Sequence, residues 1–338
     1  MSKPRPILGE MPWNVKQMIV ESADTKTKIS LRPTAKSLKY VVDNSVIQYH
    51  GIRLQINEHF STVSLEVNIT ARQRTPDFQL EFRTDRAVMN CWVSGTFEKE
   101  LKDGDFIDLL AQKFTKVFRN PHAIVNTLEI KEVSIFQDAD YMDRRERIMS
   151  AIRTHLSRLP HKINVECLKI SAKDQHQIVP ILQKIKPVVL KTINLRSSDL
   201  REDFPLDSVA GMEQWKKARC LNVHDLNLML PERDTKHFDE IICRMDNFGL
   251  EQIKASIETI FNGAIKRSIK VKRVALNAIA SYLGQNLSTP DCKQFKISRG
   301  SAFCNVKLLY SCCSNIVVFY NPEKTSVGHD WDVAASFY

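Results

Sequence analysis

Residues 10–45 place their apolar positions at the spacing of short helices. Asp24 can end the first helix and cap the second, and Pro33 interrupts the pattern because proline inside a helix costs a hydrogen bond. The apolar residues of the first and third helices are Val15, Met18, Ile19, Leu38, Val41 and Val42. The pattern predicts three helices with too few apolar residues for an independent core, and therefore a unit that a partner stabilises.

A different pattern begins near residue 50 and ends near residue 100. Segments such as IRLQINEH and VSLEVNIT alternate apolar and polar residues, which is typical of half-buried strands. After residue 104, amphipathic helical segments alternate with strand segments, and three of the strands begin near residues 163, 189 and 218. This spacing of roughly 25 to 30 residues is that of stacked leucine-rich-like units.

The alternation of helix and strand defines the expected fold class, which is α/β. Parallel strands joined by helical crossovers predict a largely parallel sheet with helices on its outer side. Because the LxxLxLxxN consensus is absent, we predict an irregular leucine-rich-like solenoid after a small N-terminal three-helix module. The C-terminal segments QFKISRG, NVKLLYS and NIVVFYN follow one another without helices, and we expect them to finish the sheet and cover its edge.

Composition and charge narrow the classes of function. The chain has 338 residues, of which 43% are hydrophobic and 26% charged, as in ordinary globular proteins. Its net charge is +10, but lysine and arginine are interleaved with acids along the whole chain. The densest basic stretch, Lys266 to Arg273, alternates like a strand with one solvated face. We therefore do not expect a nucleic-acid partner.

The sequence also indicates a compartment. No apolar run reaches the roughly 18 residues that cross a bilayer, so no membrane partner is expected. The first residues lack the apolar segment of a secretory signal. The eight cysteines lie scattered without a CxxC pair, which favours reduced core thiols over a disulfide framework or a zinc site. We expect the cytoplasm, the nucleus or both.

The sequence contains none of the common motifs of catalytic sites. The GxSxG, GxxxxGK[ST], HExxH and GxGxxG patterns are absent. Asp138, Asp140 and Asp143 lack the glycine and the later glutamate of a calcium loop. We therefore expect no enzyme activity, no catalytic residue, no metal and no cofactor.

Trp215, in the segment MEQWKKAR, is expected to pack in the core, and a surface hot spot for a partner is the alternative.

The N-terminal segment MPWNVKQMIVESADTKTKISLRPTAKSLKYVVDNS resembles an F-box. The positions of the family pattern are taken by Met11, Pro12, Val15, Met18, Ile19, Asp24, Leu31, Arg32, Ala35, Lys36, Leu38 and Val42. Ala23 and Thr34 stand where a larger apolar residue is usual, and Trp13 departs from the pattern. The resemblance implies a surface for a Skp-type adaptor made of Met11, Pro12, Val15, Met18, Ile19, Leu31, Arg32, Leu38 and Val42.

A second segment, over roughly residues 145 to 265, resembles the FTH domain that accompanies F-boxes in a family expanded in nematodes. The residues that carry this resemblance are Ile181, Leu182, Lys186, Pro187, Leu190, Ile193, Glu213, Gln214, Trp215, Lys216 and Ala218. We predict an F-box over residues 6–48, a strand-rich start of the recognition region over 49–140, and an FTH-like helix/strand domain over 141–330.

Together the two resemblances imply a non-catalytic substrate receptor of an SCF-type ubiquitin ligase. The F-box would bind the Skp-type adaptor and through it a cullin, and the FTH region would hold a target protein whose identity and contact residues the sequence does not name. The alternative is a protein-interaction solenoid with a degenerate F-box that acts outside ubiquitylation, which Ala23 and Thr34 favour.

Overall fold

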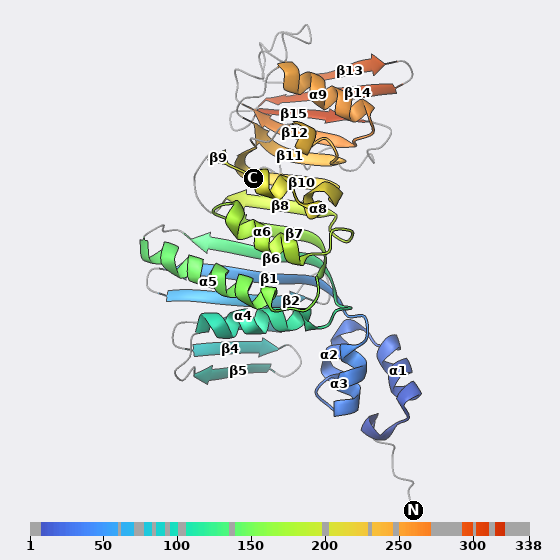
Figure 1. Cartoon of the computed structure of the whole chain (residues 1–338), viewed down its shortest axis with the longest axis vertical. Coiled ribbons are helices and arrows are strands. Elements are labelled where there is room, and N and C mark those ends of the chain that lie inside the picture. Colours follow the sequence, from blue (N-terminus) through green and yellow to red (C-terminus); the bar gives the residue numbers. More distant parts are fainter. Residues whose placement is uncertain are drawn as a thin grey trace, which may run out of the picture. The chain divides into compact units, whose positions relative to one another are not determined.

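The computed structural model divides the chain into two compact units (Figure 1). Unit 1 comprises Met1–Ile170 and Pro180–Leu190, and unit 2 comprises Ser171–Val179 and Lys191–Tyr338. The residues that the structure describes are 8–59, 62–70, 78–82, 86–91, 95–100, 106–134, 139–197, 203–228, 232–245, 250–271, 293–299, 302–310 and 315–321.

Unit 1 begins with a 3₁₀ turn and three α-helices. These are η1 (Leu8–Glu10), α1 (Trp13–Ser22), α2 (Thr25–Leu31) and α3 (Lys36–Asp43). Asp24 caps α2, because its side chain accepts a hydrogen bond of 2.7 Å from the backbone N–H of Thr27.

The core of these helices differs from the predicted one at α1. Val20 is buried together with Leu38, Val41 and Val42 of α3, whereas Met18 is exposed. Lys16 is buried beside Val20, and its ammonium group donates to the Ser37 hydroxyl at 3.0 Å. The buried residues of α1 are therefore Val20 and Lys16, whose long apolar stem packs inward, and the pattern of apolar positions did not single them out.

The sheet of unit 1 has a parallel part and an antiparallel part. Its strands are β1 (Gln48–His59), β2 (Thr62–Thr70), β3 (Phe78–Phe82), β4 (Arg86–Cys91), β5 (Gly95–Glu100), β6 (Ile124–Ser134) and β7 (Asn164–Ala172). β1, β6 and β7 pair in parallel, while β1 to β5 form an antiparallel meander. The helices α4 (Phe106–Lys116) and α5 (Ala139–Ser157) lie side by side over one face of this sheet (Figure 1).

The register of the parallel strands separates a buried face from a polar one. One cross-strand row is apolar and buried, and consists of Leu54, Ile130 and Ile170. The neighbouring row, on the opposite face, is charged and consists of Arg53, Glu129 and Lys169. Arg53 donates through Nε to the Glu129 carboxylate at 2.5 Å across the strands. Each strand thus gives its alternate residues to the core and to solvent.

Unit 2 repeats the helix-and-strand pattern and closes with an antiparallel edge. Its strands are β8 (Thr192–Ser197), β9 (Asp203–Phe204), β10 (Cys220–Leu228), β11 (Glu240–Met245), β12 (Lys266–Val271), β13 (Lys293–Arg299), β14 (Ala302–Tyr310) and β15 (Asn315–Tyr320). Strands β8, β10, β11 and β12 are parallel neighbours in this order, and β9 pairs with β10. β15, β14 and β13 continue the sheet from β12 in antiparallel pairings.

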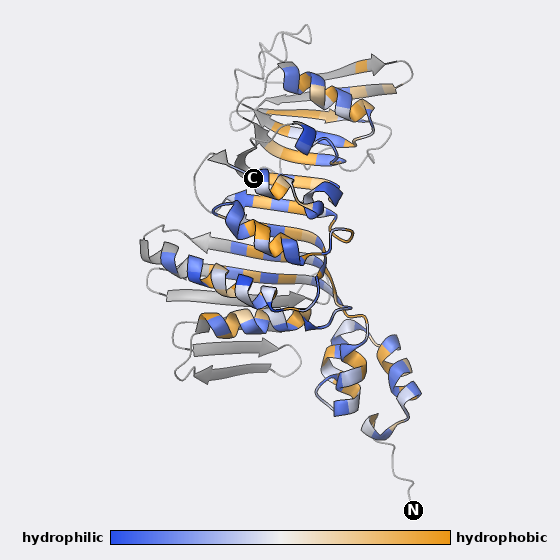
Figure 2. Ribbon diagram, in the orientation of Figure 1, coloured by the Kyte–Doolittle hydropathy of each residue, from blue (hydrophilic) through white to orange (hydrophobic). Residues whose placement is uncertain are grey.

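The five successive side chains from Ile316 to Tyr320 of β15 are all buried, so both faces of this strand are covered. Most of the strand is coloured as hydrophobic in Figure 2. The remaining helical elements are η2 (Val117–Arg119) in unit 1, α6 (Gln175–Lys184), and α7 (Asp207–Ala210), α8 (Glu213–Lys217), η3 (Glu232–Asp234) and α9 (Leu250–Phe261) in unit 2. The predicted mixed α/β class and the largely parallel sheet are confirmed, and the solenoid stays a prediction. Among the described residues, no helix combines the length and the apolar character that a membrane span needs.

Trp215 lies in the core of unit 2, as predicted. Its side chain is 0% exposed, and the indole N–H donates to the Asp234 carbonyl at 2.7 Å. The Phe238 ring meets the indole edge-on at 5.1 Å between centroids. The hot-spot alternative for Trp215 is thereby excluded, because a fully buried indole offers no surface to a partner.

Candidate partner-binding surface on the N-terminal helices

The N-terminal helices expose an unusual share of large apolar side chains. Among the residues whose burial the structure describes, six large apolar side chains are exposed, and five of them lie between residues 13 and 46. The exposed fractions are 49% for Trp13, 68% for Met18, 38% for Ile29, 62% for Tyr40 and 54% for Val46. Single exposed apolar residues are ordinary, but such a concentration on one small unit marks a binding surface.

Two of these aromatic residues pack against each other. The Trp13 ring of α1 and the Tyr40 ring of α3 lie 5.5 Å apart between centroids and are inclined by 55°. This tilted pairing joins α1 to α3 at their exposed sides. The two rings together form an aromatic platform at the surface.

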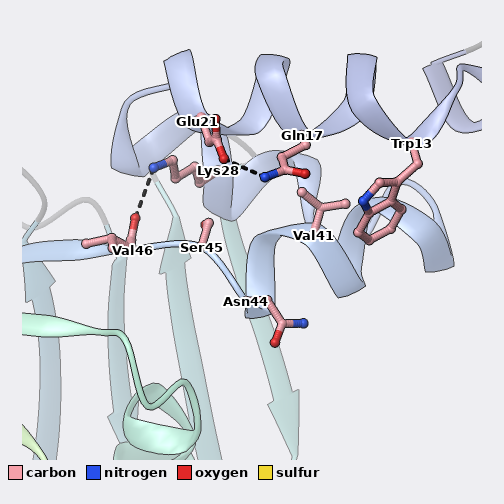
Figure 3. A pocket seen from close by; sticks show the side chains of 8 residues that line it. All are labelled: Trp13, Gln17, Glu21, Lys28, Val41, Asn44, Ser45 and Val46. Atoms are coloured by element: carbon pink, nitrogen blue, oxygen red, sulfur yellow. Dashed lines mark hydrogen bonds between the residues drawn. The ribbon is translucent and has the colours of Figure 1, made fainter.

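A pocket of about 370 Å³ opens beside this platform (Figure 3). It is lined by Trp13, Gln17, Glu21, Lys28, Val41, Asn44, Ser45 and Val46. The α1 side chains follow one another at four-residue spacing and point toward α3 (Figure 3). Val41 is buried, so the pocket combines apolar groups with a polar rim, as ligand and side-chain pockets do.

Polar contacts fix the frame of this pocket. The Gln17 amide donates to the Glu21 carboxylate at 2.8 Å along α1. The Lys28 ammonium group donates to the Val46 carbonyl at 2.9 Å, and the Thr25 hydroxyl donates to the Gln48 carbonyl at 2.8 Å. These two bonds hold α2 against the segment that leads from α3 into β1.

Arg32 and Asp43 connect the C-terminal ends of α2 and α3. The guanidinium group donates to both carboxylate oxygens, at 2.5 Å and 3.2 Å. This hydrogen bonding with Asp43 raises the pKa of Arg32 above its usual value. Tyr49 lies nearby at the start of β1, and burial raises its pKa to about 12. At neutral pH the ion pair is therefore intact and the phenol neutral.

The structure separates the predicted adaptor-binding residues into three groups. Leu38 and Val42 are fully buried in the helical core, so they support the three helices and present no surface to a partner, contrary to the prediction. Pro12 and Met18 are exposed. The half-buried group consists of Met11, Val15, Ile19, Leu31 and Arg32. Adaptor binding by the exposed and half-buried residues stays a prediction.

The helical pattern missed Trp13, Ile29, Tyr40 and Val46 as surface residues. Tyr40 lies on the polar side of α3, and Val46 follows the helix, where no periodicity applies. A signal was present at Trp13, because this residue departs from the F-box pattern. A large aromatic residue at a position where the fold does not require one is a typical anchor for a partner.

Four cysteines of the described part of the chain form no disulfide. Cys167, Cys220, Cys243 and Cys304 belong to this group. Burial raises the pKa of Cys304 to about 11, so its sulfur is protonated at neutral pH and is a weak nucleophile. In the part of the chain that the structure describes, no group of three or more metal-ligating side chains lies together.

A comparison with protein-family models identifies part of this chain. Residues 146–262 match the FTH domain. The matched segment runs from within α5 to the end of α9 and includes the buried Trp215. The same comparison does not detect an F-box. Searches among curated proteins and among solved structures each found no match. The predicted FTH resemblance is confirmed, and the F-box assignment stays a prediction.

Proposed function

We propose that this chain is a non-catalytic substrate receptor of an SCF-type ubiquitin ligase. Its N-terminal helices bind a Skp-type adaptor and through it a cullin, and the FTH domain holds a target protein. The FTH domain is associated with F-box proteins of nematodes, which supports this order of modules. The observation that carries the proposal is the concentration of exposed apolar side chains, Trp13, Met18, Ile29, Tyr40 and Val46, on and directly after three helices that precede the FTH domain.

The contribution of such a receptor is proximity rather than bond chemistry. Binding adaptor and target on one chain raises the effective concentration of the target near the ubiquitin-conjugating enzyme. We propose that the protein acts in the cytoplasm or the nucleus, where cysteines outside disulfides, such as Cys243 and Cys304, stay reduced.

Met18 provides the sharpest test of adaptor binding. Its side chain is 68% exposed, so Met18→Asp should leave the fold intact. Covering a methionine at an interface contributes about 1.5–3 kcal/mol, and stranding a carboxylate there costs more. Because about 1.4 kcal/mol changes Kd tenfold, we expect Met18→Asp to weaken adaptor binding at least about a hundredfold.

Val188 supplies a matched control for this experiment. It is also an exposed aliphatic residue of unit 1, with 81% of its surface accessible, but it lies outside the N-terminal helices. Val188→Asp should bind a purified Skp-type adaptor like the wild type in a pull-down and by calorimetry. The proposal fails if wild-type protein does not bind the adaptor, or if Met18→Asp and Val188→Asp bind equally well.

A second candidate function follows from the undetected F-box. In that case the same surface binds a protein outside ubiquitylation. Affinity purification of the full chain under proteasome inhibition separates the two candidates. Recovery of adaptor and cullin supports the receptor, whereas partners that depend on Met18 without any cullin support the interaction module.

A further inference from the structure

A second surface of unit 1 gathers positive charge from several elements. Lys113 and Lys116 lie in the last turn of α4, and Arg119 lies in η2. Lys39 belongs to α3, and Arg32 caps the end of α2. All of them except Arg32, which is partly buried, have exposed side chains. We call these five residues the Lys116 cluster.

Hydrogen bonds bring these elements together. The Asn120 amide, directly after η2, donates to the Ser45 carbonyl at 2.9 Å. The backbone N–H of Ile124 donates to the Ile47 carbonyl at 2.8 Å. The end of α3 is thus held next to the end of η2, and the charges of Lys39 and Arg119 both act on Lys116.

The cluster is crowded with like charge. Burial lowers the pKa of Lys116, and repulsion from Lys113, Arg32, Arg119 and Lys39 lowers it further. Among the ion pairs of described residues, the cluster takes part in one, between Arg32 and Asp43. Such crowding costs stability in the free protein, and a bound anion would relieve it.

Helix electrostatics explain only part of this arrangement. Lysines in the last turn of α4 are favourable, because the C-terminal end of a helix carries partial negative charge. The same reasoning accounts for Arg32 at the end of α2, but not for Lys39, which lies within α3. The convergence of several elements on one region therefore indicates a ligand.

We propose that the Lys116 cluster binds an acidic segment, rich in aspartate and glutamate, of a partner protein. Three of its cations are lysines, which attract single carboxylates as point charges. The guanidinium group of Arg32 already pairs with Asp43. Among the described residues, Arg119 is in no ion pair, so its guanidinium group is available to a ligand. A flexible acidic peptide can spread its carboxylates over α3, α4 and η2.

Nucleic acid fits this surface less well. Tight binding to a duplex uses about 6–10 phosphate contacts, more than the cluster offers.

Fluorescence anisotropy with the full chain tests this proposal. The probe is a labelled peptide of about eight residues that alternates glutamate with serine, and the reference peptide has glutamine in place of glutamate. We expect the acidic peptide alone to bind, and its affinity to fall between about 0.05 M and 0.2 M salt. Equal binding of the two peptides, or no binding of either, overturns the proposal.

Charge reversal locates the ligand. Lys113→Glu with Lys116→Glu should weaken peptide binding at least about tenfold, since two attractions become repulsions. The control is Lys162→Glu with Lys217→Glu, which changes the net charge equally at two exposed lysines elsewhere. An equal loss of affinity in both double variants, or no loss in the first, contradicts the proposal.

Two further measurements complete the test. Lys39→Glu, on α3, should also weaken the peptide, because the ligand spans both elements. A single-stranded DNA of the same charge should bind more weakly than the peptide, and tighter binding of the DNA assigns the cluster to nucleic acid instead. Adaptor binding through Met18 is a separate measurement, so either proposal can fail alone.

Discussion

Replacing Trp215 by alanine should be among the most damaging single changes in unit 2. The indole is fully buried, packs edge-on against Phe238 at 5.1 Å, and donates to the Asp234 carbonyl at 2.7 Å. Truncation of a buried tryptophan costs about 3–5 kcal/mol, through lost transfer free energy and the cavity that remains. Trp215→Phe keeps much of the apolar contact but leaves the Asp234 carbonyl without this donor, so we expect about 1–3 kcal/mol.

The measurement combines global and local unfolding. Urea denaturation gives the change in the free energy of unfolding, and hydrogen exchange of the peptides that cover β10 and β11 assigns the loss to unit 2. Lys216→Ala is the matched control, because Lys216 is exposed on the same helix and its contact with Glu213 is long, at 3.6 Å. This variant should change stability by less than about 0.5 kcal/mol. A Trp215→Ala protein that unfolds like the control would refute the assignment of the indole to the core.

Two other predictions concern single contacts. Arg32→Ala and Asp43→Ala should each destabilise the N-terminal helices. A double-mutant cycle should give a coupling free energy of about 0.5–1 kcal/mol, because both side chains are 35% exposed. A coupling free energy near zero in urea denaturation would contradict the contribution of this ion pair to the packing of α2 against α3. Burial lowers the pKa of His237 below its usual 6.5, so the folded state binds this proton less readily than the unfolded state. The contribution of His237 is then fully present above pH 6.5 and is lost as the pH falls toward the lowered value. His237→Gln should reduce this pH dependence of the urea midpoint, and an unchanged pH profile would contradict the assignment.

The sequence predicted the elements better than the surfaces. Strong periodicity located the helices and strands, and the flanking helix and strand patterns around Trp215 correctly implied a buried indole. The inner face of α1 was missed, because Lys16 is buried through its stem and its hydrogen bond to Ser37, which a pattern of apolar residues does not register. The exposed apolar residues are harder still to predict from sequence. Val46, for example, lies outside any helix, and its exposure depends on how the chain enters β1.

The Lys116 cluster could not be predicted from the sequence either, because it depends on the tertiary structure. Its members come from segments about 70 residues apart, and each local segment looks like ordinary interleaved charge. The hydrogen bonds from Asn120 to Ser45 and from Ile124 to Ile47 show that the two segments meet. Proximity of this kind is a property of tertiary structure, and a single sequence without its fold does not contain it in readable form.

The two faces of the parallel strands in unit 1 also bear on how such a protein changes over evolutionary time. Leu54, Ile130 and Ile170 carry the packing, and replacing one of them by alanine would cost about 2–5 kcal/mol. The neighbouring row of Arg53, Glu129 and Lys169 faces away from that core, where substitutions usually cost less than about 0.5 kcal/mol. Substitutions can therefore change the polar face of the sheet while the apolar face keeps the fold stable. Descendants of this chain can acquire new ligands on the polar face without a large loss of folding stability.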